Sequence, residues 1–146
     1  MKIFIAGSKS IHYLSDDTIQ ELNKIIHYVD TVLIGDCRGA DAAVQEYFAD
    51  SGYKNVIVYV SGNNVRNNIG GWEVRYISVC YETKGYDFYI QKDIAMVESA
   101  DRGLMLWDGK SKGTKRNIEH LSRNNIPVTI NKYECWVSVG RPYLVR

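Results

Sequence analysis

Apolar and polar positions alternate along the chain in a pattern that predicts strands and helices in turn. Five short apolar runs have the length and bounding residues of buried strands, and loops rich in glycine and polar residues follow the first, second and fourth. These runs cover residues 3–6, 31–34, 56–60, 103–107 and 126–130. Their spacing favours an α/β fold with a mostly parallel central sheet of about five strands and helices on both faces.

The segments between these runs place apolar residues at the 3.6-residue period of an α-helix. Ser15 suits the start of the first helix, and Gly52 suits the end of the second. Asp87 and Thr114 are the N-cap residues expected for the third and fourth helices. The apolar faces include Ile19, Leu22, Ile25, Ile26, Val29, Ala40, Ala43, Val44, Tyr47, Phe48, Ile90, Ile94, Val97, Ile118 and Leu121.

Two segments depart from this alternation. Residues 61–85 form an insertion or flap, in which residues 72–81 alternate well enough for an extra strand. Long excursions at the ligand edge of an α/β sheet often form lids or binding loops. Residues 132–146 form a C-terminal tail with the pattern of a hairpin, which would cover a sheet edge or contact a partner. We expect residues 1–146 to form a single domain.

Composition limits the class of protein. The chain has 146 residues, of which 45% are hydrophobic, enough for one domain with a real core. A net charge of +1 gives no basic stripe, so broad nucleic-acid binding is disfavoured. Cys37, Cys80 and Cys135 are too widely spaced for a disulfide framework or a zinc site, and we predict no metal or cofactor. Without a signal peptide or a run of about 18 apolar residues, a cytoplasmic protein with no membrane partner is expected.

The loop after the fourth strand predicts an anion site. Gly109 and Gly113 bend the backbone before a helix start, where free N–H groups and the helix dipole attract negative charge. Lys115 and Arg116 lie in the first turn, where each cation opposes the dipole by about 0.3–1 kcal/mol. A bound phosphate or carboxylate would reverse that cost.

Similar loops follow the first two strands. Gly7-Ser8-Lys9 comes after residues 3–6, and the segment from Gly35 to Asp41 comes after residues 31–34. Neither the P-loop spacing nor a G-x-G-x-x-G fingerprint is present. Because parallel strands end at one edge of the sheet, any phosphate site is expected to be composite and to lie at that edge.

Taken together, four segments resemble the SLOG superfamily, which joins the cytokinin-activating LOG enzymes, the DprA/Smf recombination mediators and the YpsA-type proteins. The resemblance is closest to the small stand-alone YpsA-like branch and covers residues 1 to about 130. The four segments are Gly7-Ser8-Lys9, Gly35-Asp-Cys-Arg-Gly-Ala-Asp41, Lys92-Asp93-x-x-Met96-x-x-x-Ala100-Asp101 and Trp107-Asp-Gly-Lys-Ser-Lys-Gly-Thr114.

This resemblance implies a Rossmann-like three-layer sandwich that binds a nucleotide or a nucleotide-derived, ADP-ribose-like ligand as a sensor or sequestering module. It also implies a homo-oligomer, a dimer or higher. The ligand-binding residues carried over from the motifs and their loops are Gly7, Ser8, Lys9, Gly35, Asp36, Arg38, Gly39, Asp41, Lys92, Asp108, Gly109, Lys110, Ser111, Gly113, Thr114, Lys115 and Asn117.

One departure favours binding over catalysis. Members of the glycosidase type place a Glu in the turn after Gly-Thr, whereas this chain has Asn117 at the corresponding position. If the protein is instead a nucleoside-phosphate N-glycosidase or a deoxyribosyltransferase-like enzyme, Asp41, Asp93 or Glu98 would have to act on the sugar. A further alternative is an interaction protein with a vestigial pocket. Asp41 also fits an ordinary helix start, and Lys92 with Asp93 an ordinary solvated helix face.

Overall fold

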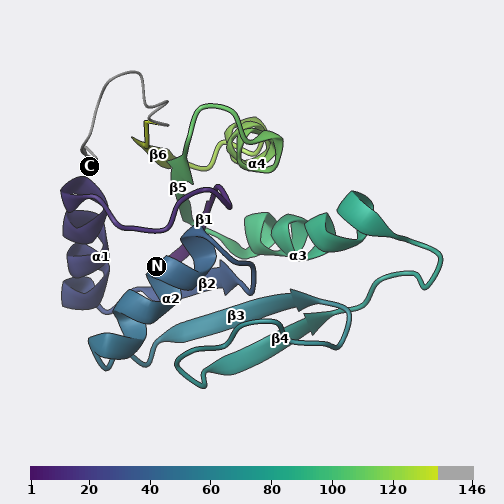
Figure 1. The fold of residues 1–146 in the computed structure, drawn as a ribbon, viewed down its shortest axis with the longest axis horizontal. Coiled ribbons are helices and arrows are strands. Elements are labelled where there is room, and N and C mark those ends of the chain that lie inside the picture. Colours follow the sequence, from purple (N-terminus) through teal and green to yellow (C-terminus); the bar gives the residue numbers. More distant parts are fainter. Residues whose placement is uncertain (135–146) are drawn as a thin grey trace, which may run out of the picture.

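The computed structural model describes residues 1–134, so most of the predicted tail, residues 135–146, lies outside the described residues. Within this range strands and helices follow one another along the chain (Figure 1). The elements are β1 (Lys2–Gly7), α1 (Asp16–Tyr28), β2 (Thr31–Gly35), α2 (Ala40–Asp50), β3 (Val56–Ser61), β4 (Glu73–Ile77), α3 (Gly85–Ser99), β5 (Arg102–Trp107), α4 (Lys112–Arg123) and β6 (Val128–Lys132).

The strands form one parallel six-stranded sheet in the order β4-β3-β2-β1-β5-β6. This confirms the predicted α/β class and the Rossmann-like layered arrangement. The extra strand is β4, which lies in the segment predicted as either a strand or a flap. It pairs with β3 at the sheet edge, and only two of its five residues are even partly buried. A weakly apolar edge strand leaves a weaker sequence signal than a central one.

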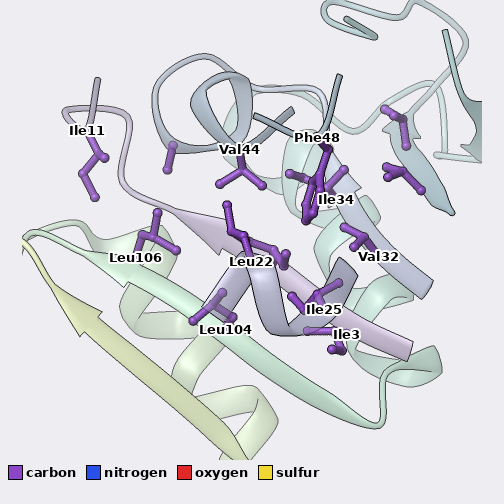
Figure 2. Close-up of a cluster of buried hydrophobic side chains, with 14 of the residues drawn as sticks. Ile3, Ile11, Leu22, Ile25, Val32, Ile34, Val44, Phe48, Leu104 and Leu106 are labelled. Carbon is purple, nitrogen blue, oxygen red and sulfur yellow. The ribbon is translucent and has the colours of Figure 1, made fainter. Parts of the chain in front are cut away.

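Helices cover both faces of the sheet. The larger core joins Leu22 and Ile25 of α1 and Val44 and Phe48 of α2 to strand side chains such as Ile34, as Figure 2 shows. On the opposite face, Met96 and Val97 of α3 and Leu121 of α4 pack against Phe4 and Met105. The apolar runs that form β1, β2, β3 and β5 are therefore buried on both sides, as expected for a parallel sheet, whereas the edge strand β6 is only partly buried.

Two predicted helix starts were wrong by several residues. The N-cap of α4 is Ser111, whose Oγ accepts from the Thr114 backbone N–H at 3.5 Å, so Thr114 already lies inside the helix. The helix α3 begins at Gly85, ahead of the predicted cap Asp87, and has no side-chain cap. Both helices therefore begin earlier in the chain than cap preference alone indicates.

The connection from β3 to β4, residues 62–72, crosses between parallel strands without a helix. Gln45 of α2 holds it: Nε2 donates to the carbonyls of Gly35 (2.9 Å) and Asn67 (3.2 Å), and Oε1 accepts from the Ile69 N–H at 2.9 Å. The indole of Trp72 donates to the Tyr53 carbonyl at 2.8 Å. This segment is therefore fixed against α2 rather than left as an unattached flap.

The order of the strands determines where a ligand site is expected. From β1 the chain proceeds through β2 and β3 to β4, then returns to place β5 on the other side of β1. The loops after β1 and β5 therefore leave the carboxyl edge of the sheet in opposite directions. The crevice between two such loops is the usual ligand site of open α/β sheets. None of the helices in residues 1–134 combines the length and apolar character that a membrane span requires.

Candidate functional site

A cavity of about 520 Å³ opens at this carboxyl edge, between the loops after β1, β2 and β5 and the start of α3. Its volume lies in the range of ordinary small-molecule sites. Ten of the residues predicted from the sequence line it: Gly7, Lys9, Asp41, Lys92, Asp93, Asp108, Ser111, Gly113, Thr114 and Asn117. The structure thus brings together loops that are distant in sequence, as the composite-site hypothesis requires.

Other predicted residues lie beside or outside this lining. Ser8 is buried beneath the cavity floor, and Gly35 underlies Asp41 and Lys92. Asp36 and Arg38 line a neighbouring cavity of about 330 Å³. The remaining residues absent from both linings are Gly39, Glu98, Gly109, Lys110 and Lys115.

Sequence reasoning also missed part of the lining. Ala6, Ser10, Cys37, Arg66, Tyr86, Tyr89, Ile90 and Lys112 were not among the predicted site residues. Arg66 comes from the irregular 62–72 segment, for which no motif gave a position. Tyr86 and Tyr89 lie near the start of α3 and are 54% and 45% exposed, so they are not core residues.

The loop between β5 and α4 is closed by its own carboxylate. Asp108 Oδ1 accepts from the backbone N–H groups of Lys110 (2.9 Å) and Ser111 (2.8 Å), and Oδ2 accepts from Ser10 Oγ at 2.7 Å. Burial alone would raise the pKa of Asp108, but these hydrogen bonds outweigh it and hold the pKa below its ordinary value. Asp108 therefore remains a carboxylate that joins the β1 and β5 loops.

The N–H groups left at this helix start are those of Lys112 and Gly113, which have no partner among the described residues. Both residues line the cavity, and a side chain at Gly113 would meet nothing within 4 Å, so the backbone there is open to a ligand. Ser8 Oγ, which accepts from the Asp108 N–H at 3.1 Å and lies 3.5 Å from Thr114 Oγ1, supports the loop from below. The anion site predicted for the whole loop is thus limited to the N–H groups of Lys112 and Gly113.

The loop between β2 and α2 packs directly on the loop after β1. Gly39 has φ +77°, and a Cβ there would lie 2.4 Å from the Lys9 carbonyl oxygen. The Ala40 N–H donates to the Ser8 carbonyl at 3.2 Å. Gly39 is thus required for this close approach, rather than for contact with a ligand.

A buried polar cluster forms the floor of the cavity. Lys92 Nζ lies 3.0 Å from Asp93 Oδ1 and donates to the Tyr89 carbonyl at 3.3 Å. Asn117 Nδ2 donates to Asp93 Oδ2 at 3.1 Å, and Asp41 Oδ2 accepts from the Cys37 N–H at 3.2 Å. The predicted alternative, a solvated face for Lys92, was wrong, because only 6% of this residue is exposed.

The charges in this cluster depend on one another. Desolvation raises the pKa of Asp41 to about 7, more than the nearby Lys92 ammonium lowers it. Desolvation opposes the charge of Lys92, but Asp93 and Asp41 outweigh it and raise the Lys92 pKa above its ordinary value. Near neutral pH the floor therefore contains one fixed ion pair and one carboxyl group that gains or loses a proton.

A wall of the cavity is built from Arg66 and Tyr89. Arg66 donates from Nη2 to Asp36 Oδ1 (2.8 Å) and from Nε to Asp36 Oδ2 (3.3 Å), and its guanidinium carbon lies 4.5 Å from the centre of the Tyr89 ring. Asp36 is 1% exposed, so this pair is held firmly at the end of β2. The wall presents an aromatic ring and a fixed cation to the cavity.

The geometry restricts which carboxylates could take part in catalysis. Both oxygens of Asp93 are already bound, by Lys92 and Asn117. Glu98 is exposed on α3 and does not line the cavity. Asp41 lines the cavity and has only Oδ2 in a hydrogen bond. Within residues 1–134 no group of three or more His, Cys, Asp or Glu side chains is placed to hold a metal ion.

Comparisons of the chain with protein-family models, with curated proteins and with solved structures give no match. The candidate function therefore depends on the site's own geometry and on the motif resemblance.

Proposed function

We propose that this protein binds a nucleotide or a nucleotide-derived ligand at the carboxyl edge of its sheet, as a sensor or sequestering module. The observation that carries this proposal is the cavity itself, which combines free N–H groups at the start of α4 with an aromatic wall and a buried polar floor. A phosphate fits the N–H groups of Lys112 and Gly113. The ring of Tyr89 and the side chain of Ile90 offer a surface for a base.

The floor supports recognition of the sugar. Asp41 and Lys92 supply an acceptor and a donor of the kind that ribose hydroxyl groups need, and Asp93, itself bound by Asn117, holds Lys92 in place. The motif resemblance to the SLOG superfamily supports the same ligand class. It also supports this placement, because most of the quoted motif residues line the cavity or lie directly beneath it.

A second candidate, cleavage of an N-glycosidic bond, depends on Asp41 alone. Its position in the lining and its unbound Oδ1 favour it over Asp93 and Glu98. Asn117, where glycosidase-type relatives would carry Glu, donates to Asp93 and holds the floor in place instead. Binding without cleavage therefore remains our first proposal.

Cys37 provides a direct test, because it lines the cavity while Cys80 is exposed elsewhere. We expect nucleoside monophosphates to slow alkylation of Cys37 by a thiol reagent while the rate at Cys80 stays unchanged, as measured by peptide mass spectrometry. Ligand at 100 times its dissociation constant should also stabilise the fold by about 2.7 kcal/mol.

The same samples decide between binding and cleavage. Recovery of the ligand with unchanged mass supports a sensor. Release of a free base that is lost in Asp41→Asn supports the glycosidase. If no nucleotide or nucleotide sugar protects Cys37 or shifts the melting temperature, the nucleotide proposal is wrong.

A further inference from the structure

The second cavity, of about 330 Å³, is the more basic of the two. Its lining comprises Lys9, Asp36, Cys37, Arg38, Arg66 and Asn67, so three of its six residues carry positive charge. Asp36 is the only carboxylate among them, and it is bound on both oxygens by Arg66. An anion entering this cavity would therefore meet little repulsion.

Two of these positively charged side chains make no hydrogen bond or ion pair with the described residues. The side chains of Lys9 and Arg38 are exposed and have no hydrogen-bond or ion-pair partner among the described residues. By contrast, Arg66 is fixed by Asp36 and stacked on Tyr89. The cavity thus offers one rigid cation and two that are free to close on a ligand.

The two cavities adjoin each other. Lys9, Cys37 and Arg66 line both, so the two cavities share part of their walls. The first cavity has its free backbone N–H groups at the start of α4, across the central crevice from the loop that carries Arg38. A ligand that spans both would meet two anion-binding regions separated by the aromatic wall and the polar floor.

We infer that the second cavity binds a second phosphate of the same ligand, so that the preferred ligand carries phosphates on two sides of a nucleoside, as nucleoside bisphosphates and dinucleotides do. This inference rests on the proposed nucleotide site and narrows its ligand class. Lys9 and Arg38 contact the second phosphate, and Arg66 separates it from the base.

Comparing the affinities of a nucleoside bisphosphate and the corresponding monophosphate tests whether the second cavity binds a second phosphate. For wild-type protein we expect a nucleoside 3′,5′-bisphosphate to bind at least about tenfold more tightly than the 5′-monophosphate, by calorimetry, because charge-assisted hydrogen bonds are strong. Adenine and uracil compounds represent the purine and pyrimidine nucleotides. The variant Arg38→Glu should lose most of this advantage and keep monophosphate affinity within about threefold, since Arg38 lines only the second cavity.

Lys54→Glu is the matched control. It makes the same change in net charge at an exposed position just before β3, at the opposite edge of the sheet. It should keep the full bisphosphate advantage. Thermal melting of both variants verifies that they fold.

The outcomes separate the two proposals. Equal affinity of wild type for monophosphate and bisphosphate, or an advantage that survives Arg38→Glu, overturns the second phosphate site and leaves the nucleotide site standing. Failure of every nucleotide to bind or to protect Cys37 overturns both. A 5′-phosphorylated trinucleotide carries the same chemistry within a nucleic acid, and tighter binding of it than of the bisphosphate overturns the assignment to a free nucleotide.

Discussion

Two helices, α2 and α4, begin beside the same crevice, and their first turns are built in opposite ways. The start of α4 is capped by Ser111, and the Asp108 carboxylate already occupies two N–H groups of the preceding loop. The start of α2 has no side-chain cap at Gly39 and carries a buried Asp41 in its first turn. It lies beside Lys9 and Arg38, whose charges are unpaired within residues 1–134.

This difference shows that a glycine-rich loop does not by itself define an anion site. At α4 the Asp108 carboxylate already accepts two of the backbone N–H groups expected to bind an anion, so only those of Lys112 and Gly113 remain for a ligand. At α2 the glycine serves close packing, and the positive charge comes from side chains. Substitutions at the two helix starts should therefore differ in size and in sign.

The largest effect is expected for Gly39→Ala. A Cβ there would lie 2.4 Å from the Lys9 oxygen and 2.5 Å from Lys9 Cα, at a φ of +77°. Backbone strain and overpacking together should lower the free energy of unfolding by about 2–5 kcal/mol, measured by urea denaturation.

Gly52→Ala is the matched control, because it has φ +68° but nothing within 4 Å of the added atom. Only the strain remains there, so a cost of about 1–2 kcal/mol is expected. Equal costs at the two positions would show that the α2 start does not depend on close contact with Lys9.

The next effect depends on pH and concerns Asp41. Its pKa is raised from 3.8 to about 7, so the folded protein holds a proton that the unfolded chain releases in this range. The associated stability is complete below about pH 4 and is lost as the pH rises through about 7.

Asp41→Asn stays neutral at every pH and can still accept from the Cys37 N–H. Its stability relative to wild type should therefore increase with pH from about 4 to about 8, by at most about 1.4 kcal/mol per unit. Urea denaturation of both proteins across this range measures the difference. A difference that does not change with pH would contradict the raised pKa.

A smaller effect is expected for Asp108→Ala, which removes the acceptor of Ser10, Lys110 and Ser111. Loss of these bonds should cost about 1–2 kcal/mol in unfolding experiments at neutral pH. Because the pKa of Asp108 is lowered, the cost should diminish as the pH falls below about 4.

Asp87→Ala is the comparison for this loop, since Asp87 lies in the first turn of α3 and its carboxylate has no hydrogen-bond partner among the described residues. It should cost no more than about 0.3–1 kcal/mol through the helix dipole. An Asp108 variant as mild as this one would show that the loop does not need its carboxylate.

The smallest effect should have the opposite sign. Lys115 is exposed in the first turn of α4 and lies outside both cavities, so its charge only opposes the helix dipole. Lys115→Glu should stabilise the protein by about 0.3–1 kcal/mol at low salt, with Lys115→Gln in between. Destabilisation would contradict the helix-dipole argument, and loss of nucleotide binding would return Lys115 to the ligand site predicted from the sequence.

Periodicity in the sequence determined most of the fold. Apolar runs such as residues 3–6 and the spacing of Leu22 and Ile25 predicted strands, helices and the buried face of α1, because burial requires the same pattern in any context. The predicted face of α3 was wrong in part, because Lys92 and Met96 are buried there with Val97, whereas Ile90 and Ile94 are only partly buried. A mostly parallel sheet was predicted as well, whereas the strand order comes only from the tertiary structure. The edge strand β4 was predicted only as one alternative, because three of its five residues are exposed, and the starts of α3 and α4 differ from the residues that cap preference favours.

For the site, the sequence identified the loops but not the roles of their residues. It named Gly39 and Asp108 by position in a motif, and Lys115 by its charge in the first turn of a helix. Only the tertiary structure shows that Gly39 permits loop packing, that Asp108 binds its own backbone and that Lys115 lies outside the cavity. It also shows that Arg66 joins Asp36 and Tyr89 across the end of β2. Local pattern specifies which segments form strands and helices, whereas the environment of a polar side chain depends on residues distant in sequence, and no local pattern records them.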